Sequence, residues 1–186
     1  NRLRSRAADA VRFADNVRGA SVEMTDNRIV GDDEGIDFDG NVTASLVDIS
    51  GNRSIEGGDD GIAVDGSILL LSQFRVVNNE EIIGSDDGIN VNEIILSEFE
   101  ANRNGLIEGS NGSGIEFDGL VFLSDVEVVA NEDVIGGEYG IEFDSDVVAS
   151  SVRIARNDRV RGRDVSGISF RGDVDDSTVR IVNNRR

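Results

Sequence analysis

The chain lacks several residue types on which common stabilising and catalytic devices depend. Its 186 residues include no cysteine, no histidine and no proline. The absence of cysteine excludes disulfide bonds and thiolate metal or redox sites. The absence of histidine excludes serine and cysteine triads, imidazole zinc sites and histidine acid–base catalysis. Tryptophan is missing too and aromatic residues make up only 5% of the chain, so its core must be mainly aliphatic.

Lysine is also absent, because all 18 basic residues are arginine, and 37 acidic residues give a formal net charge of -19. Such a chain repels nucleic acid and anionic membranes and attracts divalent cations and basic partners. No apolar run is long enough to cross a membrane. We therefore expect neither a nucleic-acid partner nor membrane insertion. Residues 29–150 hold 28 of the acids and only 3 of the arginines, so the acidic charge is concentrated in the middle of the chain.

The most informative feature of the sequence is a repeat of 26 or 27 residues. Each copy begins with a Gly-Ile pair, and a phenylalanine or valine follows two residues later. A second segment has the pattern small-x-apolar-x-apolar, with an asparagine three residues further on. A third, shorter segment has the pattern apolar-x-Gly. The Gly-Ile pairs are Gly35-Ile36, Gly61-Ile62, Gly88-Ile89, Gly114-Ile115, Gly140-Ile141 and Gly167-Ile168.

This pattern predicts three short strands per repeat, because apolar residues alternate with polar ones and turn residues separate the segments. One such unit cannot bury its apolar side alone, but stacked units share a continuous interior. The fold class is therefore all-β: a parallel β-helix solenoid of about seven coils of 26–27 residues, with three short strands per coil. We expect residues 1–186 to form a single β-helix domain that is a fragment of a longer chain.

Two polar columns accompany the apolar ones. The asparagines are expected to occupy a tight bend that requires left-handed backbone, and to hydrogen-bond from coil to coil through their side-chain amides. A serine begins the second segment of most repeats and is expected to bond neighbouring backbone. Without histidine or lysine to activate them, these serines are not expected to be nucleophiles. The asparagine ladder is predicted at Asn52, Asn79, Asn104, Asn131 and Asn157.

The phrases Asn-x-x-Ile-x-Gly and Gly-Ile-x-Phe-Asp-Gly, together with the asparagine column, resemble the pectate-lyase-like right-handed β-helices. They are also similar to the generic parallel β-helix repeats of surface and autotransporter-type proteins. The resemblance covers nearly the whole chain. It implies the right-handed coil, an extracellular or cell-surface location, and a group that includes carbohydrate-binding proteins, polysaccharide lyases and glycoside hydrolases.

Acidic residues flank the Gly-Ile strand on both sides, and three interpretations of them remain open. They are solvated turn residues that bond their own backbone, ligands of a divalent cation such as Ca²⁺, or catalytic carboxylate pairs. Stacked carboxylates one strand spacing apart repel each other unless something offsets their charge. The candidate metal ligands are Asp33, Asp39, Asp59, Asp65 and Asp86.

The constant repeat length argues against an enzyme. By resemblance, enzymes of this group build a cleft from long loops between coils and hold sugars with basic and aromatic residues. This chain has no long insertion, one tyrosine and few central arginines. We therefore expect a non-catalytic structural or binding segment of a secreted or cell-surface protein, such as a stalk, adhesin or assembly module, with calcium as a candidate stabiliser. The alternative is a carbohydrate-active lyase or hydrolase. Expected partners are further copies stacked end to end or laterally, flanking domains of the same chain, or carbohydrate.

Overall fold

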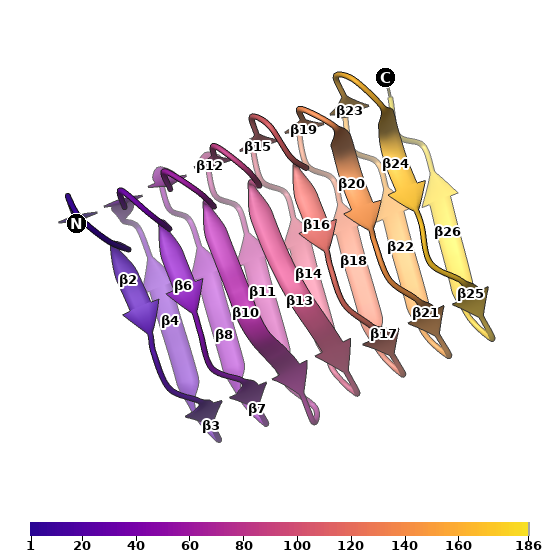
Figure 1. The fold of residues 1–186 in the computed structure, drawn as a ribbon, viewed down its shortest axis with the longest axis horizontal. Coiled ribbons are helices and arrows are strands. Elements are labelled where there is room, and N and C mark those ends of the chain that lie inside the picture. The colour runs from indigo at the N-terminus through magenta and orange to yellow at the C-terminus, as the bar shows by residue number, and fades with distance from the viewer. Residues whose placement is uncertain (186) are drawn as a thin grey trace.

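The chain forms a solenoid of stacked coils (Figure 1). The computed structural model describes residues 1–185 and contains strands, turns and bends. No helix in this part of the chain is suited to crossing a membrane. In Figure 1 the front strands descend and the strands behind them ascend as the chain advances from its N-terminus to its C-terminus. The coil is therefore right-handed, which confirms the predicted fold class and the number of coils.

Three parallel sheets, named A, B and C here, run along the solenoid. Sheet A consists of β1 (Arg2–Arg4), β5 (Arg28–Val30), β9 (Ser54–Glu56), β12 (Glu81–Gly84), β15 (Leu106–Gly109), β19 (Asp133–Gly136) and β23 (Arg159–Gly162). Sheet B has a main path of β2 (Val11–Phe13), β6 (Ile36–Phe38), β10 (Ile62–Leu69), β13 (Ile89–Ile95), β16 (Ile115–Phe117), β20 (Tyr139–Phe143) and β24 (Ser166–Phe170). Sheet C consists of β4 (Ser21–Thr25), β8 (Leu46–Ser50), β11 (Gln73–Val77), β14 (Glu98–Asn102), β18 (Asp125–Val129), β22 (Ser151–Ala155) and β26 (Thr178–Val182).

Sheet B is longer than the repeat pattern predicts. A second, two-residue strand follows its main strand in five coils, and in the third and fourth coils the two merge into the longer strands β10 and β13. The short strands are β3 (Val17–Arg18), β7 (Val42–Thr43), β17 (Val121–Phe122), β21 (Val147–Val148) and β25 (Val174–Asp175). The three predicted strands per coil are therefore present, and the sheet B strand continues beyond the Ile-x-Phe unit to the next turn.

Equivalent residues of successive coils lie directly over one another. Ile62 pairs in register with Ile36 on one side and with Ile89 on the other. The isoleucines and valines that face inward from all three sheets form one cluster, and most of them are completely buried. This single interior runs the length of the solenoid, as the repeat pattern predicts.

Seven phenylalanine rings form a continuous stack inside the solenoid, with one ring in each coil. Adjacent ring centroids lie 4.5 to 6.0 Å apart. Five rings come from sheet B, but in the third and fourth coils the sheet B position is valine and the ring comes from sheet C instead. The interior therefore keeps one ring per coil although the sheet that supplies it changes. The rings belong to Phe13, Phe38, Phe74, Phe99, Phe117, Phe143 and Phe170.

The predicted asparagine column is a hydrogen-bonded ladder between sheets C and A. The backbone N–H and the Nδ2 of Asn79 both donate to Oδ1 of Asn104, at 2.9 and 3.1 Å. The same Nδ2 donates to the carbonyl oxygen of Ile49 at 2.9 Å. The expectation that these asparagines occupy left-handed backbone is wrong. The preceding residue has the positive φ in each coil, for example Asn78 at 57° and Arg103 at 56°. The ladder asparagines are therefore selected for their amides, not for their backbone.

A serine ladder marks the turn between sheets B and C. Oγ of Ser72 accepts a hydrogen bond from the backbone N–H of Ser45 at 3.2 Å and donates to the carbonyl oxygen of Leu69 at 2.6 Å. The serines are buried and their hydroxyls are engaged with backbone. They link coils, as the sequence predicts.

The glycine of each Gly-Ile pair is needed because the coils approach closely there. A Cβ atom added at Gly88 would lie 2.6 Å from the carbonyl oxygen of Gly114 in the next coil. A Cβ added at Gly61 or Gly140 would come within 2.5 to 2.6 Å of the equivalent oxygen. Only glycine allows the spacing of about 4.8 Å between parallel strands at this bend.

Candidate functional site

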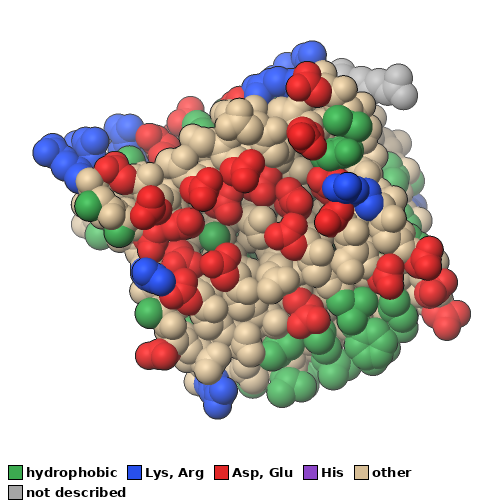
Figure 2. All heavy atoms as spheres, in the orientation of Figure 1, with side chains coloured by type: hydrophobic (Ala, Val, Ile, Leu, Met, Phe, Trp, Pro, Cys, Tyr) green, Lys and Arg blue, Asp and Glu red, His purple; other side chains and the backbone are tan. Residues whose placement is uncertain are grey.

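Acidic side chains gather in a band that crosses the outer face of sheet B (Figure 2). We call this band the acidic face. It comprises three columns: the residue before each Gly-Ile pair, the residue between the inward-facing isoleucine and phenylalanine, and the residue that follows them. Its members are Asp9, Glu34, Asp37, Asp39, Asp60, Asp65, Asp87, Glu116, Asp118, Glu142 and Asp144.

Strand alternation directs the central column outward. In β6, Ile36 and Phe38 face the interior, so Asp37 between them must face away from it. Asp37 is nevertheless only 3% exposed, because its neighbours in the acidic face cover it. Glu142 occupies the equivalent position in β20 and is equally buried. Carboxylates at such depth require partners or must hold a proton.

One arginine forms ion pairs with the carboxylates at the N-terminal end of the acidic face. Arg12 lies in the central column of the first coil and reaches to the second coil, where it donates to Oδ2 of Asp39 from Nε at 3.0 Å. Its Nε also lies 3.3 Å from Oδ2 of Asp37 and 3.7 Å from Oδ2 of Asp9. The single guanidinium is thus shared by three carboxylates. It leaves a net negative charge in this part of the face.

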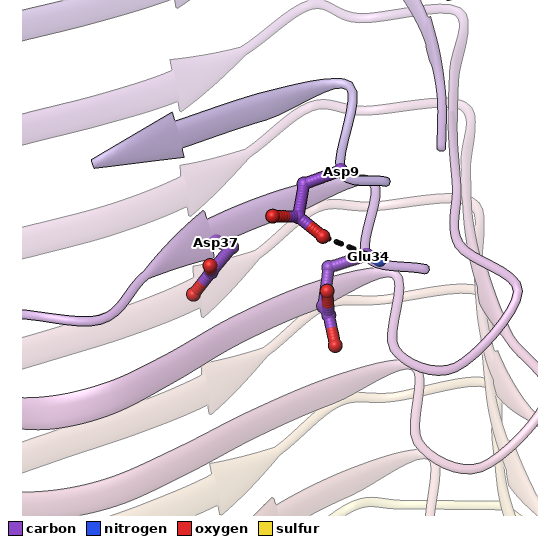
Figure 3. A group of neighbouring side chains, drawn as sticks. All are labelled: Asp9, Glu34 and Asp37. Atoms are coloured by element: carbon purple, nitrogen blue, oxygen red, sulfur yellow. Dashed lines mark hydrogen bonds between the residues drawn. The ribbon is translucent and has the colours of Figure 1, made fainter. Parts of the chain in front are cut away.

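Asp37 belongs to two carboxylate groups at this end. In one group, one oxygen each of Asp9, Glu34 and Asp37 lie within 4.8 Å of one another, and in the other the same is true of Asp37, Asp39 and Asp65. Figure 3 shows Asp9 and Glu34 on the turns of successive coils and Asp37 on the strand that follows. The backbone N–H of Glu34 donates to Oδ1 of Asp9 at 3.2 Å. Oδ1 of Asp37, in contrast, is buried and has no hydrogen-bond partner.

The crowding of these carboxylates changes their acidity. A hydrogen bond shared with Asp9, with burial as a second cause, raises the pKa of Glu34 to about 8. Burial, followed by a hydrogen bond shared with Asp39, raises the pKa of Asp37 to about 7. The hydrogen bond from Arg12 lowers the pKa of Asp39. Near neutral pH, Glu34 therefore keeps its proton and Asp37 is about half protonated, and a cation bound by Asp37 would displace the proton of Asp37.

The middle of the acidic face has no arginine among its described contacts, and its carboxylates bond to backbone, to neutral side chains and to one another. Asp60 accepts a hydrogen bond from the backbone N–H of Asp87 at 2.9 Å, and Asp87 accepts one from Ser113. Burial raises the pKa of Asp60 to about 7. Burial, together with the nearby charge of Asp87, raises the pKa of Glu116 to about 9. Near neutral pH, Glu116 therefore keeps its proton and Asp60 is about half protonated.

A second arginine serves the C-terminal end of the face. Arg171 lies 3.3 Å from Oε1 of Glu142 and 2.9 Å from Oδ1 of Asp144. Burial raises the pKa of Glu142, although the charge of Arg171 opposes that shift. The acidic face is thus bounded by one arginine at each end, and the carboxylates between them are offset only by protons and neutral donors.

The structure divides the candidate metal ligands of the sequence analysis into two sets. Asp39 and Asp65 lie in the group that contains Asp37. Asp33, Asp59 and Asp86 lie in an exposed turn column, where their backbones bond from coil to coil at 3.0 Å. These three lie outside both carboxylate groups found among the described residues.

Sequence reasoning did not single out Asp37, Glu116 or Glu142 as site residues. The available signal was their position, because each is an acid between two inward-facing apolar residues of one short strand. Alternation places such a residue on the outer face, in line with its equivalents in the next coils. Its burial depends on side chains from neighbouring coils, and the strand pattern alone does not report it.

The donor atoms of the two groups suit a hard cation. All are carboxylate oxygens, which Ca²⁺ and Mg²⁺ prefer, and the chain has no thiolate or imidazole to select a softer metal. The unpartnered Oδ1 of Asp37 is a buried acceptor that a cation would satisfy. The residues present therefore fit a divalent cation held by Asp37, Asp39 and Asp65.

The acidic face is less suited to glycoside hydrolysis. Glycosidase carboxyl groups stand about 5–5.5 Å apart in retaining enzymes and about 6.5–9.5 Å apart in inverting ones. The atoms of the two groups described here lie within 4.8 Å. Most of the phenylalanine rings are stacked inside the solenoid, so they offer no platform for a sugar.

Comparison with models of protein families, with curated proteins and with solved structures finds no match.

Proposed function

We propose that this chain is a non-catalytic structural and binding segment of a secreted or cell-surface protein, acting as a rigid stalk or assembly module. The observation that carries the proposal is the uninterrupted interior. One ring per coil, a continuous asparagine ladder and a constant repeat length make the coils of residues 1–185 alike, which favours a scaffold over a catalytic cleft. A rod of this kind holds its outer faces at fixed spacing, which is what a stalk or scaffold requires.

A turnover assay tests the absence of catalysis. The protein is incubated with pectate, alginate, xylan and hyaluronan, with and without calcium, and new reducing ends and unsaturated products are measured. We expect no product above that of a heat-denatured control. Turnover that is lost on Glu34→Gln or Glu116→Gln substitution, with the fold retained by circular dichroism, would contradict the proposal.

The same proposal includes stabilisation by a divalent cation at Asp37, Asp39 and Asp65. Three carboxylates and one shared arginine leave this part of the acidic face with excess negative charge, and a bound cation would neutralise it. The buried, unpartnered Oδ1 of Asp37 supports this assignment. The role of the cation here is structural: it would tie the second and third coils together and displace the proton held by Asp37.

Calorimetry tests the cation site. We expect the melting temperature to rise with calcium relative to EDTA, because a ligand of the native state stabilises it by mass action. Asp65→Asn should abolish the rise. Asp118→Asn is the matched control, because Asp118 follows the same strand two coils further on and lies outside both carboxylate groups. Proton release on binding should accompany the rise. Equal melting temperatures in calcium and EDTA would exclude the cation site without affecting the rod.

A carbohydrate-active β-helix remains the second candidate, supported by one observation. Glu34 and Glu116, with pKa values raised to about 8 and about 9, are protonated near neutral pH, as a general acid must be. The turnover assay separates this candidate from the first. For this candidate, product formation should depend on Glu34 or Glu116 and persist in EDTA.

A further inference from the structure

The turn that leads from sheet B to sheet C contains a residue with left-handed backbone in each coil. In the third, fourth and fifth coils that residue is leucine, and the third coil has two in succession. Their φ angles are 53° for Leu70, 64° for Leu71, 52° for Leu96 and 49° for Leu123. Left-handed backbone costs an L-residue other than glycine about 1–2 kcal/mol, and asparagine and aspartate tolerate it best.

The molecule contains its own comparison for this choice. At the equivalent bend between sheets C and A, the left-handed positions are mostly small or polar, as expected for exposed turns. They are occupied by Asp26, Gly51, Asn78, Arg103, Ala130, Arg156 and Asn183. Within the sheet B to sheet C turn itself, the outer coils use Gly19, Ala44, Ala149 and Asp176. Among these left-handed positions, leucine therefore occurs only in the sheet B to sheet C turn of the three central coils.

These leucines are exposed instead of buried. Leu71 is 84% exposed, Leu70 53% and Leu123 46%. Figure 2 shows the hydrophobic side chains gathered along the lower edge of the molecule, where β10, β13, β17 and β21 end. The other large exposed apolar residues lie near the two ends of the solenoid, so this central set stands apart. We call Leu70, Leu71, Leu96 and Leu123 the leucine ridge.

Three residues of the leucine ridge line a groove of about 350 Å³. They are Leu71, Leu96 and Leu123, and Glu98 and Asp125 at the start of two sheet C strands line the same groove. An adjoining hollow continues onto the outer face of sheet C, where Glu100 and Glu127 join the same two acids. Their arginine partners are Arg75 for Glu100 and Arg153 for Glu127. Glu98 and Asp125 have no ion pair among the described residues.

We propose that the leucine ridge and the acids beside it form a docking surface for a basic amphipathic polypeptide segment. Apolar side chains of the partner pack on the leucines, and its arginine or lysine side chains meet Glu98 and Asp125. Charge complementarity selects this occupant. A second copy docked ridge to ridge would oppose acid to acid, and an anionic membrane would be repelled by a chain of net charge -19. This surface lies apart from the acidic face and does not depend on cation binding.

The position of the leucines supports a binding role on energetic grounds. Replacing an exposed, left-handed leucine by asparagine should relieve backbone strain and remove only the contacts of its covered part, which is small at Leu71 and largest at Leu96, 38% exposed. A sequence selected only for stability would therefore carry asparagine there, as Asn78 and Asn183 show at the other bend. Retention of exposed apolar residues at a cost in stability is typical of interaction sites.

A labelled peptide of alternating leucine and lysine tests the proposal. Its binding to the chain is followed by fluorescence anisotropy at two salt concentrations. We expect the triple variant Leu71→Asn, Leu96→Asn and Leu123→Asn, whose charge is unchanged, to bind at least tenfold more weakly while its melting temperature stays equal or rises. The matched control is Ala44→Asn with Ala149→Asn, in the same turn outside the ridge, which should bind as the unmodified chain does.

Further variants and control ligands identify what binds to this surface. Glu98→Gln with Asp125→Asn should weaken peptide binding and reduce its salt dependence, and a peptide of alternating leucine and glutamate should not bind. Equal affinity of the triple variant and the unmodified chain would overturn the proposal. So would a dimer in analytical ultracentrifugation that the triple variant loses, because the occupant would then be a second copy. Binding to neutral phosphatidylcholine vesicles that depends on the leucines would overturn it in favour of a lipid surface.

Discussion

The exchange of phenylalanine between sheets B and C allows a direct test of the shared interior. In the third coil Val64 faces inward from sheet B and Phe74 from sheet C, whereas in the second coil the same positions are Phe38 and Val47. The double substitution Val64→Phe with Phe74→Val converts the third coil to the arrangement of the second. Each single substitution leaves that coil with two rings or with none.

The structure sets the expected magnitudes. Phe74 is fully buried between two rings, with centroids at 5.3 and 6.0 Å. Phe74→Val should therefore cost about 2–3 kcal/mol, somewhat less than the 3–5 kcal/mol typical of Phe→Ala. Val64→Phe inserts a ring into a filled layer and should cost about 1–3 kcal/mol. The double variant conserves volume and should lose about 1 kcal/mol, with a coupling energy of roughly 2–5 kcal/mol.

Urea denaturation followed by circular dichroism measures all three variants, with the slope of the transition checked for constancy. The new ring at position 64 should stack on Phe38 as Phe13 does, where the centroids are 4.5 Å apart. If the double variant loses the sum of the two single losses within about 0.5 kcal/mol, the two positions do not share one volume. That result would refute the single shared interior.

Three further predictions concern the ladder, the acidic face and the glycine column. Asn104→Ala removes the acceptor of two buried N–H groups of the preceding ladder asparagine and should cost about 2–4 kcal/mol in urea denaturation, whereas Glu132→Ala on the surface should cost less than about 0.5 kcal/mol. In EDTA the melting temperature should fall as the pH rises from about 5 to about 9. Acids such as Glu116, with a pKa of about 9, keep protons in the folded state that the unfolded chain releases near pH 4. A melting temperature that rises over that range would contradict the raised pKa values. Gly88→Ala would place a Cβ 2.6 Å from the carbonyl oxygen of Gly114 and should lower the unfolding free energy by about 1–3 kcal/mol, and an unchanged midpoint would show that the coils can separate there.

The fold could be predicted because the repeat constrains it at every level. A fixed spacing of 26 or 27 residues places equal side chains in register, and alternation within each segment assigns them to the inside or the outside. The short strands that extend sheet B were not predicted, because their two-residue pairs carry too little pattern to separate from a turn. The left-handed backbone was predicted at the ladder asparagine, but the residue before each asparagine adopts it. The turn residues vary from Gly51 to Arg103, so composition did not mark the position.

The candidate site was predictable only in part. The acidic columns are visible in the sequence, and Asp39 and Asp65 could be named from them. The depth of Asp37 could not be predicted, because it depends on Arg12 reaching from the preceding coil and on the neighbouring carboxylates. The exposed turn column of Asp33 was equally acidic in the sequence, and only coordinates separate it from the column of Glu34 that faces the site.

The transfer of the aromatic ring from one sheet to another divides the rod into three blocks. Coils one and two, three and four, and five to seven each repeat one internal arrangement, with edge-to-face rings at the two boundaries between Phe38 and Phe74 and between Phe99 and Phe117. At each boundary the regular repeat of the core is interrupted, because the ring changes from one sheet to the other. A whole coil duplicated within a block would meet matching neighbours, so the rod can lengthen there without repacking. A coil moved into a different block would carry its ring on a different sheet from the coils beside it, so the core would have to repack.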